Sequence, residues 1–221
     1  ATHHDWRWLS LDDPLALGLQ IDLPPEQAIA RLTRIVRACP DAAALDLTLT
    51  IEVRRPCTVP VALHPTLRLD RGRVQLALNH HGPGLTYPVP AEPGRSRVSP
   101  GRHFGTLAAV PLASTGLDTA PSPRAEGSGD FSRYPQPADS EELLLLMGLQ
   151  GPVQAHFLDA GWTLQLDWDQ ATLPDLMLWV SHRGRRHPPW NGRHWALGLE
   201  PVHGAFDLGR VARPPEGHPL S

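Results

Sequence analysis

The stretch "ALDLTLTIEV", residues 44–53, is the clearest signal of fold in the sequence. Apolar and polar residues alternate strictly along it, which is the pattern of a β-strand with one buried face and one solvated face. The apolar side carries Leu45, Leu47, Leu49, Ile51 and Val53, and the polar side carries Asp46, Thr48, Thr50 and Glu52. The stretch therefore predicts a strand of an antiparallel sheet.

Other stretches extend this prediction. Residues 161–168, "GWTLQLDW", alternate in the same way, and residues 175–181, "DLMLWVS", are apolar on both faces, which predicts a central strand covered on two sides. The 25 prolines of the chain would break most long helices. In residues 24–39, "PPEQAIARLTRIVRAC", the apolar spacing favours a helix, although the stretch can also be read as a strand.

The length and the loops indicate how the chain is organised. A chain of 221 residues can form one β-rich domain, so we predict a single domain over residues 1–221. Residues 79–136 are rich in Gly, Pro, Ser and Arg and predict long loops. Within them "HFGTLAAVPLAS", residues 103–114, predicts one short strand.

Composition excludes several classes of partner. The net charge is −3 and the basic residues are scattered, so we expect no nucleic-acid partner. No apolar run approaches the roughly 20 residues of a membrane helix, so we expect no membrane partner. The Cys and His residues lack the spacing of a metal site, and we expect no metal. Without a visible signal peptide, cytoplasm is the default localisation, and the oligomeric state stays open.

One acidic residue follows small side chains on the same face of a predicted strand. Residues 194–206, "HWALGLEPVHGAF", read as a strand in which Ala196, Gly198 and Glu200 share one face. A carboxylate on an inward face is costly unless it is paired, lies in a cleft or works as a titrating group. Glu200 is therefore a candidate catalytic residue, the alternative being a salt bridge at the end of a strand.

A histidine has the same setting. In residues 57–69, "CTVPVALHPTLRL", Pro60, Ala62 and His64 share one face, and Pro65 ends the pairing of the strand. Histidine exchanges protons near neutral pH, so an acid and a histidine that face one cleft would form a general base and a general acid. The alternative is a histidine satisfied in the core or at the surface. The sequence thus pairs His64 with Glu200 as a candidate site.

Two segments resemble the aldose 1-epimerase (galactose mutarotase) family: residues 45–70, which contain "LHP", and residues 173–209, which contain "LGLEP". The resemblance implies an all-β fold, an antiparallel β-sandwich of the mutarotase supersandwich type, with residues 29–39 as a strand. It implies an isomerase that interconverts the anomers of a hexose or modified sugar without a cofactor. It assigns Glu200 as the base that removes the proton of the C1 hydroxyl and His64 as the acid that protonates the ring oxygen.

The chain also departs from the family. The family has an earlier histidine, in a His-Gly pair before a tryptophan that Trp6 or Trp8 would match. That pair would lie before Ala1 or be replaced by His3 or His4, and early strands of the family have no counterpart. We therefore expect either a missing N-terminal segment or a shortened relative. The main alternative to an isomerase is a carbohydrate-binding protein on the same fold that has lost catalysis.

Three further residues are candidates for binding the sugar. Asp139 matches the family's substrate-binding acid, and the sequence does not distinguish it from Glu141 or Glu142. Trp190, in "HPPWNG", could stack on a sugar ring or anchor its loop in the core. His182 belongs to a basic loop that could meet an anionic sugar or be solvated.

Overall fold

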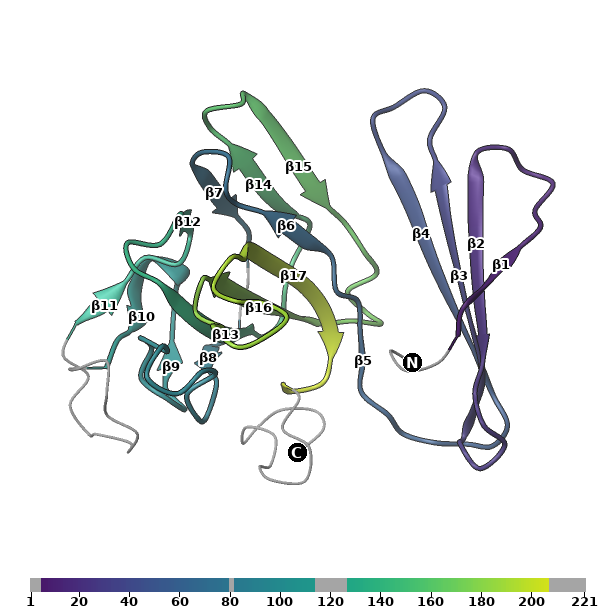
Figure 1. Cartoon of the computed structure of the whole chain (residues 1–221), viewed down its shortest axis with the longest axis horizontal. Helices are drawn as coiled ribbons and strands as arrows, with labels where there is room; N and C mark the ends of the chain where they lie inside the picture. Colours follow the sequence, from purple (N-terminus) through teal and green to yellow (C-terminus); the bar gives the residue numbers. More distant parts are fainter. Residues whose placement is uncertain (1–4, 80–81, 114–126, 207–221) are drawn as a thin grey trace. The chain divides into compact units, whose positions relative to one another are not determined.

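The computed structural model describes residues 5–79, 82–113 and 127–206. The described elements are β-strands, except for one 3-10 turn, η1 (Leu107–Ala109). The predicted all-β fold class is confirmed. The chain forms two compact units, residues 1–59 and residues 60–221 (Figure 1). The single domain over residues 1–221 stays a prediction.

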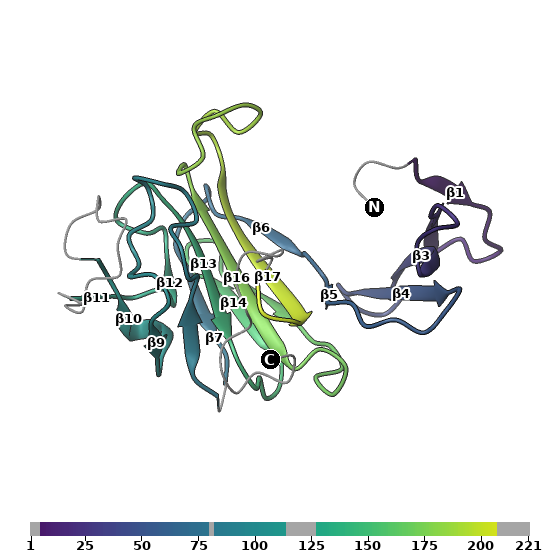
Figure 2. The ribbon, with the colours of Figure 1, turned by 90° about the horizontal axis from the view of Figure 1, so that it is seen from below.

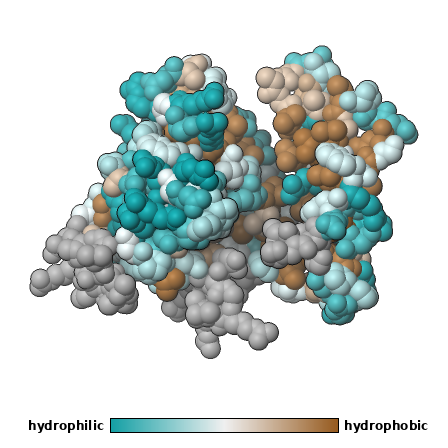
Figure 3. Space-filling model, viewed as in Figure 1, coloured by the Kyte–Doolittle hydropathy of each residue, from teal (hydrophilic) through white to brown (hydrophobic). Residues whose placement is uncertain are grey.

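The first unit is a four-stranded antiparallel sheet in the order β1-β2-β3-β4. Its strands are β1 (Arg7–Leu9), β2 (Ala16–Asp22), β3 (Ile29–Ala38) and β4 (Leu45–Val53). The stretch that favoured a helix by its spacing is strand β3, as the family resemblance implies. Register pairs Leu47 with Val36 and Ile51 with Leu32, so the apolar side chains share one face. Figure 3 shows apolar side chains gathered over β3 and β4.

The second unit contains two larger sheets. The seven-stranded sheet has the order β5-β17-β16-β13-β8-β9, with β6 also paired to β17. Its strands are β5 (Val61–Ala62), β6 (Thr66–Arg68), β8 (Gly84–Thr86), β9 (His103–Phe104), β13 (Ser140–Leu146), β16 (Asp175–His182) and β17 (Trp195–His203). The four-stranded sheet has the order β12-β7-β14-β15. Its strands are β7 (Val74–Ala77), β12 (Arg133–Tyr134), β14 (Val153–Phe157) and β15 (Trp162–Leu166).

The main core lies between these two sheets. Leu144, Leu178 and Leu199 of the larger sheet are fully buried in one cluster with Val153 and Ala155 of the smaller sheet. Each such leucine contributes about 1.5–3 kcal/mol by leaving water. β16 lies between β17 and β13 and packs on this core, so Leu176, Leu178 and Val180 are buried. The strand is central, as predicted, but its second face is only partly covered, since Met177 and Trp179 are half-buried.

The other face of the seven-stranded sheet holds polar residues beside a second apolar cluster. Strands β13, β16 and β17 run side by side (Figure 2), and their register aligns three rows of side chains on this face. The rows are Glu141–Ser181–Ala196, Leu143–Trp179–Gly198 and Leu145–Met177–Glu200. Leu145 and Met177 pack with Leu85, Val202 and Phe206. The polar part of this face is therefore bordered by apolar residues.

The described part of residues 79–136 contains more short strands than predicted. Residues 103–111 form β9, η1 and β10 (Val110–Pro111), and β10 pairs with β11 (Ser128–Gly129). The prediction of one short strand there was wrong, because two-residue strands and a turn leave no alternating pattern in the sequence. Among the described residues, no helix is long and apolar enough to cross a membrane.

Candidate functional site

The backbone brings His64 beside Glu200. Leu63 N–H donates to the carbonyl of Pro201, and Leu199 N–H donates to the carbonyl of Pro65, each at 2.9 Å. These two bonds attach the segment around His64 to the residues on either side of Glu200. Pro65 has no N–H to donate, so it interrupts the pairing with β17, which resumes in β6 where Thr66 pairs with Gly198. The sequence predicts that Pro65 ends the pairing of the strand, whereas in the structure Pro65 only interrupts it.

The two side chains are in direct contact. Nδ1 of His64 lies 2.5 Å from Oε1 of Glu200. The His64 side chain is 57% exposed, whereas that of Glu200 is 6% exposed. The contact with the Glu200 carboxylate raises the pKa of His64 and outweighs the effect of partial burial. His64 therefore favours its protonated form, which is the form of a general acid.

Gly198 makes room for the carboxylate. A Cβ atom at this position would clash with Oε1 of Glu200 and would lie 3.1 Å from Cβ of Trp179. The glycine is therefore needed for the observed position of Glu200, as the small residues before it in the sequence indicate.

Sequence reasoning missed Trp179 and Ser181, which belong to the same face. Trp179 stacks on His64, with ring centroids 5.4 Å apart and an interplanar angle of 29°. Its Nε1–H donates to Oε1 of Glu141 at 2.6 Å, and the Ser181 hydroxyl donates to Oε2 of Glu141 at 2.9 Å. The sequence signal for Trp179 was the two-sided apolar strand, which indicated burial and gave no hint of a site.

Glu141 also forms a buried ion pair. Its carboxylate is 0% exposed, and Nε of Arg185 lies 2.8 Å from its Oε1. Burial raises the pKa of Glu141, against the opposing effect of its three donors. Gly184 permits this pair, because a Cβ atom there would lie 2.7 Å from Glu141 N and force the loop away from β13.

Trp190 is connected to the same cluster through Arg185, which contacts both tryptophans. The Arg185 guanidinium carbon is 5.3 Å from the ring centroid of Trp179 and 5.1 Å from that of Trp190, both within the range of a cation–π contact. The predicted sugar-binding residue Trp190 is thus connected to Trp179, and through Trp179 to His64.

Asp139 has different partners. Its carboxylate lies 3.2 Å from Arg186 and 4.0 Å from Arg183. The structure places Asp139 just before β13 with these loop arginines, and in the described part of the chain no ion pair or hydrogen bond joins it to His64 or Glu200. Glu141, one of the two alternatives, lies on the face of Glu200.

His182 and Glu142 face the other side of the sheet. His182 is 2% exposed and packs beside Tyr134 and Trp195, and burial lowers its pKa to about 4. Glu142 accepts from the backbone N–H of Arg97 at 2.7 Å, and burial raises its pKa to about 8. The structure therefore does not bring His182, a predicted sugar-binding residue, to the face of Glu200, because residues 181 and 182 alternate in the strand.

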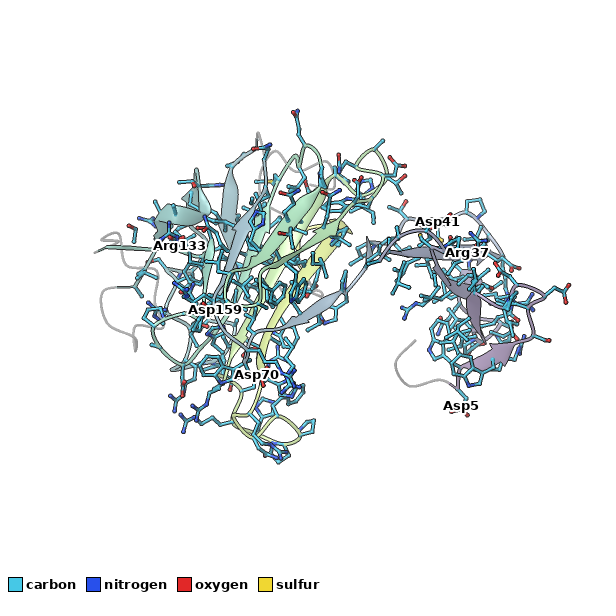
Figure 4. The ribbon with its side chains drawn as sticks, turned by 90° about the horizontal axis from the view of Figure 1, so that it is seen from above. Asp5, Arg37, Asp41, Asp70, Arg133 and Asp159 are labelled. Carbon is cyan, nitrogen blue, oxygen red and sulfur yellow. The ribbon has the colours of Figure 1, made fainter. Side chains whose placement is uncertain are left out.

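The earlier histidine of the family has no described counterpart, since His3 and His4 lie outside the described residues. Within the described ranges, no three His, Cys, Asp or Glu residues gather in a way that could hold a metal ion. A hollow of about 430 Å³ lies on the smaller sheet, lined in part by Arg73 and Arg133. Arg73 is paired there with Asp159 at 2.6 Å, and Figure 4 labels Asp159 and Arg133 on this unit. None of its lining residues belongs to the face of Glu200.

The geometry of the site suits paired proton transfer. A buried carboxylate and a more exposed imidazole of raised pKa meet on one face, next to an indole and an arginine–carboxylate pair. One group can accept a proton while the other donates one to a neighbouring atom of the same substrate.

Comparisons with known proteins support the fold. A scan against protein-family models gives no match, and neither does a search of curated proteins. A search of solved structures matches a candidate aldose 1-epimerase from Escherichia coli K12, with a TM-score of 0.53 and 14% sequence identity. The match covers 90% of this chain and 57% of that one, so this chain spans just over half the length of that protein. At this identity the likeness shows a shared β-sandwich fold.

Proposed function

We propose that this chain is an aldose 1-epimerase-like isomerase that interconverts the anomers of a hexose or a modified sugar. The observation that carries the proposal is the 2.5 Å contact between His64 and Glu200 on one sheet face of a fold similar to that of a candidate aldose 1-epimerase. The sequence resemblance assigns the same two residues as acid and base.

The reaction needs two proton transfers in each direction. Glu200 accepts the proton of the C1 hydroxyl while His64 donates a proton to the ring oxygen, and the bond between C1 and the ring oxygen breaks to give the open-chain aldehyde. Rotation about the C1–C2 bond turns the aldehyde. His64 then takes the proton of the C5 hydroxyl as it attacks C1, and Glu200 returns its proton to the C1 oxygen. Neither a free alkoxide nor an oxonium ion has to form at neutral pH, and no cofactor takes part.

The neighbours of the pair favour an uncharged sugar. Arg185 is paired with Glu141, Arg183 and Arg186 lie by Asp139, and His187 lies 3.8 Å from Glu92. Arg183, Arg185 and Arg186 therefore lie beside carboxylates, which leaves less positive charge for a phosphate or a uronate. The aromatic surface of Trp190 suits the apolar face of a pyranose ring.

Polarimetry tests the proposal directly. Freshly dissolved α-glucose and α-galactose should reach anomeric equilibrium faster with the protein than in buffer alone. Glu200→Gln should reduce the acceleration by about 10²–10⁴-fold, the usual contribution of a general base, while the protein still binds the sugar. The matched control is Glu52→Gln, an exposed acid of the first unit, which should keep full activity. Equal rates with and without the wild-type protein would overturn the proposal.

The second candidate is a carbohydrate-binding protein that does not catalyse. It is favoured by the 14% identity to the candidate aldose 1-epimerase, because a fold shared at that level does not fix function. Titration calorimetry with the same sugars distinguishes the two: binding without acceleration of mutarotation would support the second candidate, and acceleration would exclude it.

A further inference from the structure

We propose that Trp179, held in place by Glu141, is a positioning residue whose indole fixes the orientation of the His64 imidazole towards Glu200. The proposal rests on the proposed function for its catalytic consequence. The geometric part, that the indole orients the imidazole, can be tested without any activity.

The first observation is that His64 needs a support. Its side chain is 57% exposed, and it lies between β5 and β6 at the point where strand pairing is interrupted by Pro65. An exposed histidine there would sample several rotamers, each of which points its nitrogens elsewhere. The indole of Trp179, stacked at 5.4 Å with an interplanar angle of 29°, covers one face of the imidazole and restricts it.

The second observation is that the indole is itself fixed. Its Nε1–H donates at 2.6 Å to a carboxylate that is fully buried. Glu141 is in turn held by the Ser181 hydroxyl and the Arg185 guanidinium, at 2.9 and 2.8 Å. A buried carboxylate with three donors has little freedom to move, because each lost bond leaves an unsatisfied group away from water.

The third observation is that three of the four residues lie in hydrogen-bonded neighbouring strands. Glu141, Trp179 and Glu200 lie on the neighbouring strands β13, β16 and β17, and only His64 lies outside a strand. The order of contacts is Glu141 to Trp179, Trp179 to His64, and His64 to Glu200. The indole thus bridges the fixed carboxylate of one strand and the movable imidazole that meets the carboxylate of another.

The consequence is catalytic. A general acid must keep its proton within hydrogen-bond reach of the ring oxygen, and misplacement by about 1 Å can cost on the order of 10²-fold in rate. If Trp179 sets the orientation of His64, its loss should lower kcat and leave KM nearly unchanged. If Trp179 only binds the sugar, its loss should raise KM and leave kcat unchanged.

The experiment compares Trp179→Leu, Trp179→Phe and Glu141→Gln with the wild type by NMR of the His64 ring, assigned with His64→Gln. The matched control is Trp162→Leu on the smaller sheet. It also removes a stacked tryptophan, whose ring centroid lies 3.9 Å from that of Phe157. In the wild type the ring protons of His64 should shift upfield because they lie over the indole. Trp179→Leu should abolish this shift and bring the pKa of His64 back towards its ordinary value, because the contact with Glu200 loosens. The control should change neither.

The kinetic readout uses the same variants. Trp179→Leu should lower kcat for mutarotation by about 10–100-fold. Trp179→Phe keeps a ring under His64 and should recover most of the rate, even if Trp179→Leu fails to fold. Glu141→Gln keeps an acceptor for the indole N–H, so its kcat should lie between those of Trp179→Leu and Trp179→Phe.

The outcomes separate the two proposals. Unchanged His64 resonances in both Trp179 variants, or a rise in KM alone, would overturn the positioning role. If the wild type accelerates no sugar but Trp179→Leu still releases His64, the proposed function fails and the orientation of His64 by Trp179 stands.

Discussion

Nδ1 of His64 lies 2.5 Å from Oε1 of Glu200, and the backbone on both sides of the contact is hydrogen-bonded. The hydrogen bonds from Leu63 to Pro201 and from Leu199 to Pro65 hold the segment that carries His64 against β17. The contact between His64 and Glu200 therefore follows from the backbone pairing. The C1 hydroxyl oxygen and the ring oxygen of a pyranose are bonded to the same carbon. Two groups that act on these oxygens therefore have to lie close together, as these two residues do.

The pH dependence of activity should follow His64. Because the Glu200 carboxylate raises the pKa of His64 above its ordinary 6.5, the acid form persists above that pH. We expect kcat/KM to fall as pH rises through this raised pKa. The contact should stabilise the fold fully below pH 6.5 and lose its effect as pH rises through the folded-state pKa. Since His64 is more than half exposed, this amounts to less than about 1 kcal/mol.

NMR titration of His64 checks the cause of this shift. In Glu200→Gln the pKa of His64 should fall, since the contact with the carboxylate is the main factor that raises it. Glu52→Gln should leave the titration unchanged. A titration of His64 that is the same in wild type and Glu200→Gln would contradict the prediction.

Gly198→Ala should reduce activity without unfolding the protein. Alanine is normally favoured over glycine within a strand by about 0.5–1 kcal/mol. The added methyl group would, however, clash with Oε1 of Glu200, and the carboxylate can move away because it ends a side chain. We expect the mutarotation rate to fall by about 10–100-fold, as for a misplaced catalytic group.

The matched control for this variant is Gly105→Ala. A Cβ atom at Gly105 would meet nothing within 4 Å, so activity should not change. Polarimetry measures both variants, and thermal unfolding shows whether they are folded. Full activity of Gly198→Ala would mean that the position of Glu200 does not depend on this glycine.

The sequence predicts the strands and singles out Glu200 and His64 as candidates because these depend on local patterns. Alternation in residues 44–53 predicts β4, and small residues before Glu200 and His64 indicate space beside each. The pairing of the two candidates rests on the resemblance, since alternation does not tell which strands are neighbours.

The rest of the site depends on information that a single sequence does not carry. Asp139, Glu141 and Glu142 all carry a carboxyl group, and only the register of β13 decides that Glu141 shares the face of Trp179. His182 follows Ser181 directly, so one residue decides which side of the sheet it faces. The ambiguous residues 24–39 show the same limit, because an apolar face that repeats in a strand can also fit a helix.

Arg185→Met should destabilise the second unit. It removes the cation beside Glu141 and leaves a buried carboxylate whose remaining donors, Trp179 and Ser181, are neutral. Loss of one partner of a buried pair costs about 3 kcal/mol in the free energy of unfolding. Adding Glu141→Gln should recover much of this loss, because the neutral amide needs no counter-charge.

Chemical denaturation measures this double-mutant cycle. Arg183→Met is the control, since its pair with Asp139 is 4.0 Å apart and partly exposed and should be worth less than about 1 kcal/mol. Equal losses for Arg185→Met with and without Glu141→Gln would show that the ion pair is not the cause.

Glu142→Gln should change how stability depends on pH. Burial raises the pKa of Glu142 to about 8, although the backbone N–H groups of Arg97 and Val98 donate to it. Between its unfolded value of about 4.5 and this folded value, the native state holds a proton that the unfolded state has lost, so stability falls as pH rises. The neutral amide of Gln removes this dependence. We therefore expect the Tm of the wild type to fall more than that of Glu142→Gln between about pH 6 and about pH 9. Parallel losses of Tm in the two proteins would show that Glu142 ionises as readily in the folded state as in the unfolded chain.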